Sequence, residues 1–236
     1  SCTGCARTHV INTKDETGYR AYPTFKITDV GQDNLVALLR PENNIKSIFF
    51  NAVFSDPIYC GHLFETLDYI NKMPTRPVLR YSTNASGRNT QWWIDFVSRF
   101  RDGDKIDFAI DGLEDTNHIY RKKTKWHKIM ANAEAYIKSG GWAEWIMIIF
   151  EHNEHQVDEA SKLSKKMGFK YFQTKISTRG FNISGTKTHK EISVPKNKEF
   201  QPPEMKHGLV EKPVNCKAIY QEQFFLTPDN MILPCC

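Results

Sequence analysis

Trp145-Ile146-Met147-Ile148-Ile149-Phe150 is the most apolar run of the chain, and the pattern that follows it indicates the fold class. The run is typical of a buried strand. Apolar residues then recur at helical spacing up to Gly168, at Val157, Ala160, Leu163 and Met167. A second strand is expected over residues 171–176. A strand, a helix and a strand in this order form a unit with parallel strands, so the stretch predicts an α/β fold.

The same alternation runs from residue 31 to residue 176. Earlier strands are predicted over 45–50, 78–82 and 106–110. Helices are predicted over 33–39, 63–70, 92–100 and 126–137. These elements make five strands, and we expect a sixth before Cys2. The predicted fold is a partial (β/α)6 barrel whose first strand is missing, built on residues 1–179.

Residues 180–213 lose this periodicity and are rich in Lys, Pro, Ser and Thr, which is typical of a linker or a long surface loop. Residues 218–226 and 231–233 then flank the turn Thr227-Pro228-Asp229-Asn230. This pattern predicts a short C-terminal β-hairpin. We therefore assign residues 214–236 to the start of a small second domain.

Composition narrows the classes of function. With 236 residues, of which 40% are hydrophobic, the chain can bury one large core. The net charge is +5, but 32 basic and 27 acidic residues are interspersed, which favours a solvated surface over a nucleic-acid interface. No apolar run approaches the roughly 20 residues that span a bilayer. We expect a soluble, cytoplasmic protein.

Six cysteines in 236 residues are too few for a disulfide scaffold. Four of them lie at the extreme ends, as Cys2-x-x-Cys5 and Cys235-Cys236. This clustering suits metal ligation in a reducing compartment. A single cysteine pair can also belong to a zinc site or a redox pair.

In a parallel barrel, the loops after the strands form the site, so the residues that follow each predicted strand are informative. They are Cys2-x-x-Cys5, Phe54-Ser55-Asp56-Pro57, Ser82-Thr83-Asn84, Asp111-Gly112 and Arg179. This combination resembles the radical S-adenosylmethionine (SAM) enzymes over residues 1 to about 179. The resemblance implies a radical SAM barrel.

The resemblance also implies a [4Fe–4S] cluster held by a C-x3-C-x2-C motif. Cys2 and Cys5 match the second and third ligands, and the first would stand four positions before Cys2. We therefore expect that the sequence is cut within cofactor motifs at both ends. Gly4 departs from the aromatic residue that many members carry there.

Contacts with SAM are implied by position. Phe54, Ser55, Asp56 and Pro57 stand where the family's Gly-Gly-Glu-Pro turn receives the SAM amino group; Phe54 and Ser55 are departures from that turn. Ser82 and Asn84 would reach the ribose or the methionine carboxylate. Asp111 would line the central pocket, and either Arg121 or Arg179 would pair with a carboxylate.

The C-terminal cysteines resemble the start of a SPASM extension, whose C-x(9–15)-G-x4-C motif binds an auxiliary iron–sulfur cluster. Cys216, Asn230 and Cys235 have this spacing, with Asn230 in the glycine position. Asn, like Gly, visits positive φ values. Cys216 and Cys235 are therefore the candidate ligands of a second cluster.

The function implied is reductive cleavage of SAM to a 5′-deoxyadenosyl radical, which abstracts hydrogen from a substrate. A peptide or protein substrate is the first candidate, and a flavodoxin or ferredoxin would supply the electron. No catalytic residue is assigned. Two alternatives stay open: a non-catalytic barrel that acts as a binding module, and a structural protein whose zinc is held by Cys2, Cys5, Cys216 and Cys235.

Several further residues have ordinary structural interpretations. Cys60 is expected to pack as a small hydrophobe, and Trp92-Trp93 is expected in the core rather than against a ligand. Asn153 and Gln156 are expected to form a helix capping box flanked by solvated His152 and His155. The run Arg121-Lys122-Lys123-Thr124-Lys125 is expected to be a solvated loop.

Overall fold

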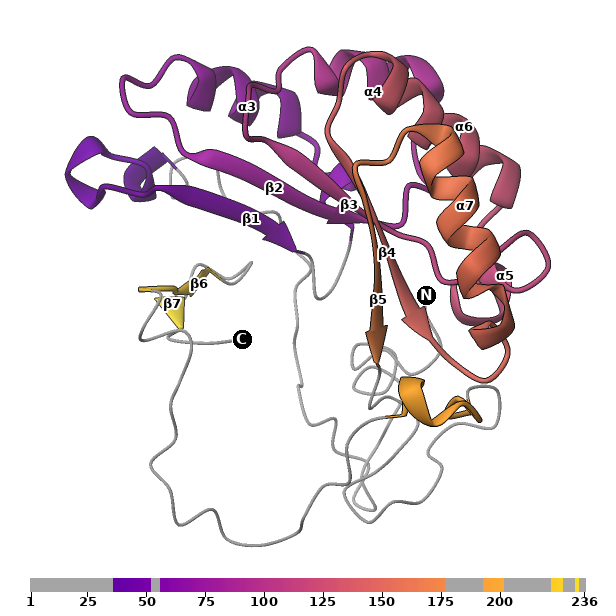
Figure 1. Cartoon of the computed structure of the whole chain (residues 1–236). Coiled ribbons are helices and arrows are strands. Elements are labelled where there is room, and N and C mark those ends of the chain that lie inside the picture. Colours follow the sequence, from indigo (N-terminus) through magenta and orange to yellow (C-terminus); the bar gives the residue numbers. More distant parts are fainter. Residues whose placement is uncertain (1–35, 52–55, 177–192, 202–221, 227–231, 234–236) are drawn as a thin grey trace, which may run out of the picture.

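The structure, a computed structural model, describes residues 36–51, 56–176, 193–201, 222–226 and 232–233. Its centre is a five-stranded sheet in which every neighbouring pair is parallel. The strands lie in chain order: β1 Ser47–Asn51, β2 Val78–Thr83, β3 Lys105–Ala109, β4 Ala143–Ile149 and β5 Tyr171–Ile176. All five carboxyl ends therefore lie at one edge of the sheet (Figure 1).

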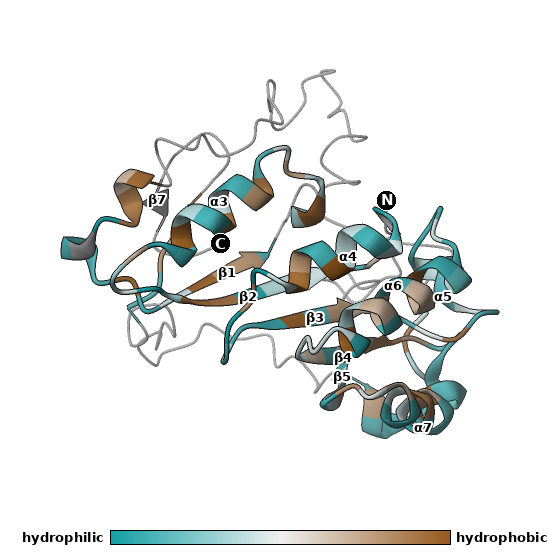
Figure 2. Ribbon diagram, turned by 90° about the horizontal axis from the view of Figure 1, so that it is seen from above, coloured by the Kyte–Doolittle hydropathy of each residue, from teal (hydrophilic) through white to brown (hydrophobic). Residues whose placement is uncertain are grey.

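Four helices pack on one side of the sheet, its outer face (Figures 1 and 2). They are α3 Leu63–Asn71, α4 Thr90–Val97, α6 Trp126–Lys138 and α7 Val157–Met167. The short helix α5, Asn117–Tyr120, follows the end of β3. A sheet whose strand order equals the chain order, with its helices on one side, is an arc of a (β/α) barrel and not a doubly wound sheet.

The four short 3-10 helices lie in connecting segments of the described chain. They are η1 Pro41–Asn43, η2 Pro57–Tyr59, η3 Glu154–Gln156 and η4 Lys198–Phe200. Two of them matter for the site described below: η2 follows the first strand and η3 precedes α7. Among the described residues no helix is long and apolar enough to cross a membrane.

The core lies between the sheet and the four helices. Side chains alternate along a strand, so Tyr81 on β2 and Phe108 on β3 point to the helices and are fully buried. Trp93 of α4 contacts Phe108 at 5.7 Å between ring centroids and is also fully buried, which confirms its predicted place in the core. Tyr136 of α6 contacts Phe108 at 5.6 Å. Aromatic rings from α4 and α6 thus pack against the same strand, β3.

The predicted elements agree closely with the structure. Each of the five strands begins and ends within two residues of its predicted bounds. The helix predicted over 92–100 is shifted and ends at Val97. Helix α7 ends at Gly168, whose φ of +91° is the left-handed cap predicted from the glycine. Cys60 is half-buried against the core, as expected for a small hydrophobe.

The C-terminal hairpin is present as two short antiparallel strands, β6 Phe225–Leu226 and β7 Ile232–Leu233. Part of the predicted linker is in contact with the barrel domain. Glu151 N donates to Ser193 O at 3.0 Å, and Asn197 N donates to Glu154 Oε2 at 2.9 Å. Residues 193–201 therefore lie against the loop that joins β4 to α7 (Figure 1).

Candidate functional site at the carboxyl edge

The candidate site lies where the parallel strands end. Asp56 follows β1, Asn84 follows β2, Asp111 follows β3 and His152 follows β4. In a barrel of this kind the loops at this edge carry the chemistry, because they converge from strands far apart in sequence.

Asp56 joins the first two strand ends. Its Oδ2 accepts hydrogen bonds from Thr83 Oγ1 at 2.8 Å and from Asn84 N at 3.0 Å. Its Oδ1 accepts from Ile58 N at 3.3 Å, so the same carboxylate caps η2. These contacts hold the turn that contains Pro57 against the end of β2.

Burial raises the pKa of Asp56 above its ordinary value of 3.8. The hydrogen bonds from Asn84, Thr83 and Ile58 oppose this shift, and so does the positive charge of Arg121. Asp56 and Arg121 therefore interact electrostatically although they follow different strands. A cation close to the buried carboxylate of Asp56 would therefore stabilise its negative charge.

The turn after β2 is held by its own side chains. Asn84 Oδ1 accepts from Ser86 N at 2.9 Å and from Ser86 Oγ at 2.5 Å. Ala85 has a φ of +55°, a left-handed conformation that costs energy for any residue with a Cβ. Asn132 of α6 donates to Ala85 O at 2.8 Å and stabilises this conformation. The turn is thus fixed before any ligand binds.

Asp111 and Arg121 form a buried ion pair. Arg121 Nε lies 2.5 Å from Asp111 Oδ2, and the side chains are 13% and 0% exposed. Asp111 Oδ1 accepts from Ile148 N at 2.6 Å, which ties the end of β3 to β4. The expectation that Arg121 lies in a solvated loop was wrong, because the carboxylate of Asp111 draws its guanidinium inward.

Asn153 and Gln156 do not form the predicted capping box. Asn153 Oδ1 accepts from Phe150 N at 2.7 Å, and its Nδ2 donates to Asp111 O and Ile148 O, both at 2.9 Å. Gln156 Oε1 accepts from Leu113 N at 3.0 Å. The side chains of Asn153 and Gln156 instead hold the loops after β3 and β4 together, because they hydrogen-bond backbone groups of those loops that lie outside α7.

His152 is only partly solvated, contrary to the expectation, whereas His155 is exposed as predicted. The His152 ring stacks on Phe150 at 5.4 Å, and its Nε2 is buried without a hydrogen-bond partner among the described residues. Burial lowers the pKa of His152, although the charge of Asp111 opposes this shift. The burial of the imidazole thus favours its neutral form over its charged form.

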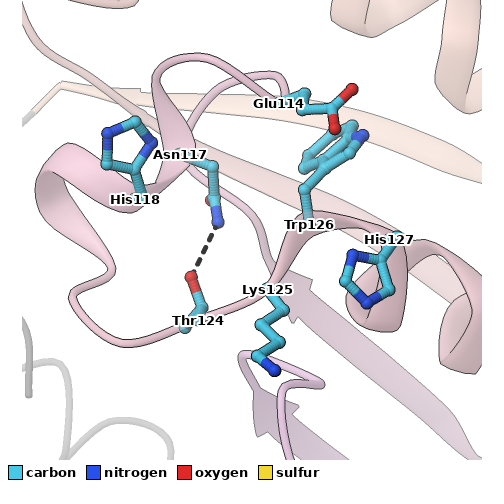
Figure 3. Close-up of a pocket in the computed structure, with 7 residues that line it drawn as sticks. All are labelled: Glu114, Asn117, His118, Thr124, Lys125, Trp126 and His127. Atoms are coloured by element: carbon cyan, nitrogen blue, oxygen red, sulfur yellow. Dashed lines mark hydrogen bonds between the residues drawn. The ribbon is translucent and has the colours of Figure 1, made fainter.

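A pocket of about 380 Å³ lies at the segment that connects β3 to the start of α6. It is lined by Glu114, Asn117, His118, Thr124, Lys125, Trp126 and His127. Figure 3 shows Asn117 Nδ2 donating to Thr124 Oγ1, a bond of 3.2 Å. None of the predicted site residues lines this pocket.

The described residues bring together Asp56, Asn84, Asp111 and Arg121 by the contacts above. Pro57 begins η2 directly after Asp56, and Ser82 lies one residue before the end of β2, on the opposite face from the core. The remaining predicted residues lie outside the described part of the chain: Phe54, Ser55, Arg179, Cys2, Cys5, Cys216 and Cys235. Within the described ranges no group of three metal-ligating side chains occurs.

Asn153 and Gln156 are parts of the site that the sequence analysis did not identify, because their spacing was interpreted as a local capping box. The distinction depends on partners about 40 residues away, such as Asp111 O and Leu113 N. Thr83 stands between the candidates Ser82 and Asn84 but was not itself selected.

No protein-family model and no curated protein matches the chain. Solved structures do match. The structure of anSMEcpe with bound AdoMet has a TM-score of 0.54 at 16% identity, covering 73% of this chain and 46% of that chain. The complex of anSMEcpe with AdoMet and the Kp18Cys peptide has a TM-score of 0.53 at 17% identity, covering 74% and 46%.

The chain thus spans just under half the length of these matched structures. At such low identity the likeness concerns the fold. It confirms the predicted fold class, a partial (β/α) barrel, here an open sheet of five parallel strands among the described residues.

Proposed function

We propose that the chain is a radical SAM enzyme, which binds a [4Fe–4S] cluster and SAM at the carboxyl edge of its sheet and abstracts hydrogen from a substrate. The observation that carries this proposal is the position of Asp56. It belongs to the turn that resembles the family's SAM-binding turn, and it is tied to the end of β2 by Thr83 Oγ1 and Asn84 N. The likeness of the fold to AdoMet-bound structures supports it.

Cys2 and Cys5 are the proposed cluster ligands in this chain, because thiolates are the usual ligands of iron–sulfur clusters. A cluster held there would supply, when reduced, one electron for the reductive cleavage of SAM that leads to abstraction of hydrogen from the substrate. The protein's part is to orient SAM and the substrate and to exclude water.

The SAM ammonium is assigned to the turn Phe54-Ser55-Asp56-Pro57. A carboxylate oxygen offers two acceptor positions, and among the described residues Asp56 Oδ1 receives one long hydrogen bond, 3.3 Å from Ile58 N. An ammonium beside it would also offset the burial that raises the pKa of Asp56. Both observations fit a cationic group at this position.

The ribose or carboxylate of SAM is assigned to Ser82 and Asn84. Asn84 Oδ1 is occupied by Ser86 N and Oγ, an arrangement that directs the amide so that its Nδ2 can act as a donor to the ligand. Asp111 has its charge balanced by Arg121 within the fold. This pairing favours Arg179 over Arg121 as the partner of the SAM carboxylate.

A peptide or protein is the proposed substrate class. Two matched structures are complexes of anSMEcpe with AdoMet and a peptide, Kp18Cys or Cp18Cys, which supports this choice. Cys216 and Cys235 are proposed as ligands of an auxiliary iron–sulfur cluster, and a flavodoxin or ferredoxin as the electron donor.

Anaerobic reconstitution tests the proposal. The protein is produced with any residues encoded before Ser1, iron and sulfide are counted, and 5′-deoxyadenosine is measured after addition of dithionite and SAM. We expect bound iron and sulfide and formation of 5′-deoxyadenosine, with loss of the product in the Cys5→Ala variant.

Two other outcomes would decide for the alternatives. Uptake of iron and sulfide without 5′-deoxyadenosine would contradict the enzyme and favour a binding module. Uptake of zinc alone, with ligands among Cys2, Cys5, Cys216 and Cys235, would contradict the cluster itself.

A further inference from the structure

The inner face of the sheet lies opposite the four long helices (Figure 1). It carries a row of polar side chains. Ser82 on β2, Asp107 on β3 and Glu144 on β4 are in register, so they lie side by side on this face. Arg80 and Lys105 form the adjacent row. Their neighbours along the strands, such as Tyr81 and Phe108, point to the helices and are fully buried in the core.

Two ion pairs join these rows. Arg80 donates from Nε at 2.9 Å and from Nη2 at 2.7 Å, and both groups converge on Asp107 Oδ2. Lys105 Nζ donates to Glu144 Oε1 at 2.8 Å. The four charges cancel in pairs, and the polar rows are therefore neutral as a whole.

Asp107 Oδ1 has no hydrogen-bond partner among the described residues, and it is buried. The side chain of Asp107 is only 4% exposed. In a bidentate pair, two N–H groups of an arginine donate to the two different oxygens of a carboxylate. Here both N–H groups of Arg80 donate to the same oxygen, Asp107 Oδ2. A buried carboxylate oxygen without a donor is unfavourable, so this atom is prepared to accept a hydrogen bond from a ligand.

The neighbourhood of this oxygen suits a ligand of mixed polarity. Ala109 lies two residues after Asp107 on β3 and on the same face, and its side chain is a single methyl group. Exposed apolar side chains border the polar rows: Phe49 is 49% exposed, Val78 is 43% exposed and Tyr171 is 60% exposed. Tyr171 is in register with Glu144.

We propose that the inner face binds an uncharged amide of a peptide, whose N–H donates to Asp107 Oδ1. An uncharged donor is favoured because Arg80 already balances the charge of Asp107, so a cation would leave a positive charge uncompensated. The border of Phe49, Val78 and Tyr171 offers contact to apolar side chains of the same peptide. Only the identification of this peptide with the substrate of the radical reaction rests on the proposed function.

Entry of the amide requires movement of side chains. Lys105 is 31% exposed, so it can turn toward solvent without displacement of the core, whereas Arg80 keeps its pair with Asp107 Oδ2. The backbone of β3 is held on both sides by β2 and β4 and stays in place. The site is thus rigid in its backbone and adjustable in its bordering side chains.

Titration by NMR with three small probes tests the proposal on the isotope-labelled chain without SAM. Acetamide carries an amide donor, N,N-dimethylacetamide has only the acceptor, and methylammonium is a charged donor. We expect a saturable shift of the Asp107 carboxyl carbon with acetamide, none with N,N-dimethylacetamide, and a weaker response to methylammonium. Equal responses to the first two probes, or no response at Asp107, would overturn the proposal.

The variant Asp107→Asn sharpens the test. Arg80 continues to require an acceptor, so the amide oxygen of the variant faces Arg80 and its NH2 group takes the place of Oδ1. The preference should reverse, and N,N-dimethylacetamide should now shift the backbone amides of Ser82 and Phe108. Glu144→Gln, the control, should keep the wild-type preference; loss of that preference would contradict a site centred on Asp107.

This test can fail independently of the proposed function. If reconstituted protein forms 5′-deoxyadenosine but the probes leave Asp107 unaffected, the inner-face site is wrong and the enzyme stands. If the probes respond as expected but no 5′-deoxyadenosine forms, the peptide-binding face stands without radical chemistry.

Discussion

The side chains of Asp56 and Thr83 meet across the ends of two neighbouring strands, where Thr83 Oγ1 donates to Asp56 Oδ2 at 2.8 Å. The two residues are 27 positions apart. Their contact joins the turn after β1 to the turn after β2, so the proposed SAM-binding groups are held at a common place before the ligand arrives. Preorganisation of this kind reduces the cost of binding.

Asp56→Asn should lower the rate of 5′-deoxyadenosine formation by about 10- to 100-fold, since hydrogen bonds to charged groups contribute about 1.5–3 kcal/mol. The measurement is product formation by reconstituted protein under anaerobic conditions. Asp158→Asn, at an exposed position of α7, is the matched control and should leave the rate unchanged. Equal rates for wild type and Asp56→Asn would contradict the assigned role.

The pH dependence of stability should also differ between these two proteins. The pKa of Asp56 is raised in the folded state, so its carboxyl contributes stability that is fully present below its unfolded value of 3.8 and is lost as pH rises through the folded value. Wild type should therefore gain stability relative to Asp56→Asn as pH falls through this window. Urea unfolding at a series of pH values measures the difference.

The ion pair of Asp111 and Arg121 should couple strongly. Removal of one partner of a buried pair costs about 3–5 kcal/mol, because the other charge is left uncompensated. The double variant Asp111→Ala, Arg121→Ala should lose less stability than the sum of the two single variants. Lys138→Ala removes the exposed pair with Glu134 and should cost only about 0.3–0.5 kcal/mol. Additive losses at Asp111 and Arg121 would refute the coupling.

Asn153 can be tested as a fastener of the β3 and β4 loops by comparison of two substitutions. If it were a helix N-cap, Asn153→Asp would be tolerated, because Asn and Asp are nearly equal at that position. In the structure Nδ2 donates to two carbonyls, Asp111 O and Ile148 O, so an aspartate would place an oxygen against them. We expect Asn153→Asp to be at least as destabilising as Asn153→Ala in thermal unfolding.

Gly112 and Gly140 form a matched pair for backbone strain. Both have positive φ, at +139° and +91°. A Cβ at Gly112 would lie 2.2 Å from Thr116 Oγ1, whereas a Cβ at Gly140 would have no heavy atom within 4 Å. Gly112→Ala should therefore destabilise the protein clearly more than Gly140→Ala, which bears only the conformational cost. Equal shifts of the melting temperature would contradict this account.

The strands and helices could be predicted because their signals are local. The apolar run of residues 145–150 and the helical spacing from Val157 to Met167 each reflect burial on one side or both sides of a single element. Gly168 marked the end of α7 because only a residue without a Cβ adopts its φ freely. Asp56, Asn84 and Asp111 were selected because they lie in loops that follow strands, at positions implied by the family resemblance.

The contacts of the site could not be predicted in this way. Asn153 was interpreted as a cap since Gln156 stands three residues later, but its partners are the backbone groups of Asp111, Ile148 and Phe150. Arg121 belongs to a run of basic residues that is typical of a solvated loop, yet it is buried against Asp111. Both outcomes depend on which loops face each other across the edge.

Element order, fold class and the positions of candidate side chains along the chain thus follow from residue type and spacing, because periodicity and chain direction are properties of the primary structure. The pairing of those side chains follows from strand register: Ser82 faces Asp107, and Asp107 faces Glu144. A shift of β3 by one residue relative to its neighbours would turn Asp107 into the core and Phe108 onto the inner face. The neutral polar rows exist, and Asp107 Oδ1 has no hydrogen-bond partner among the described residues, because packing of the four helices on the opposite face selects this register.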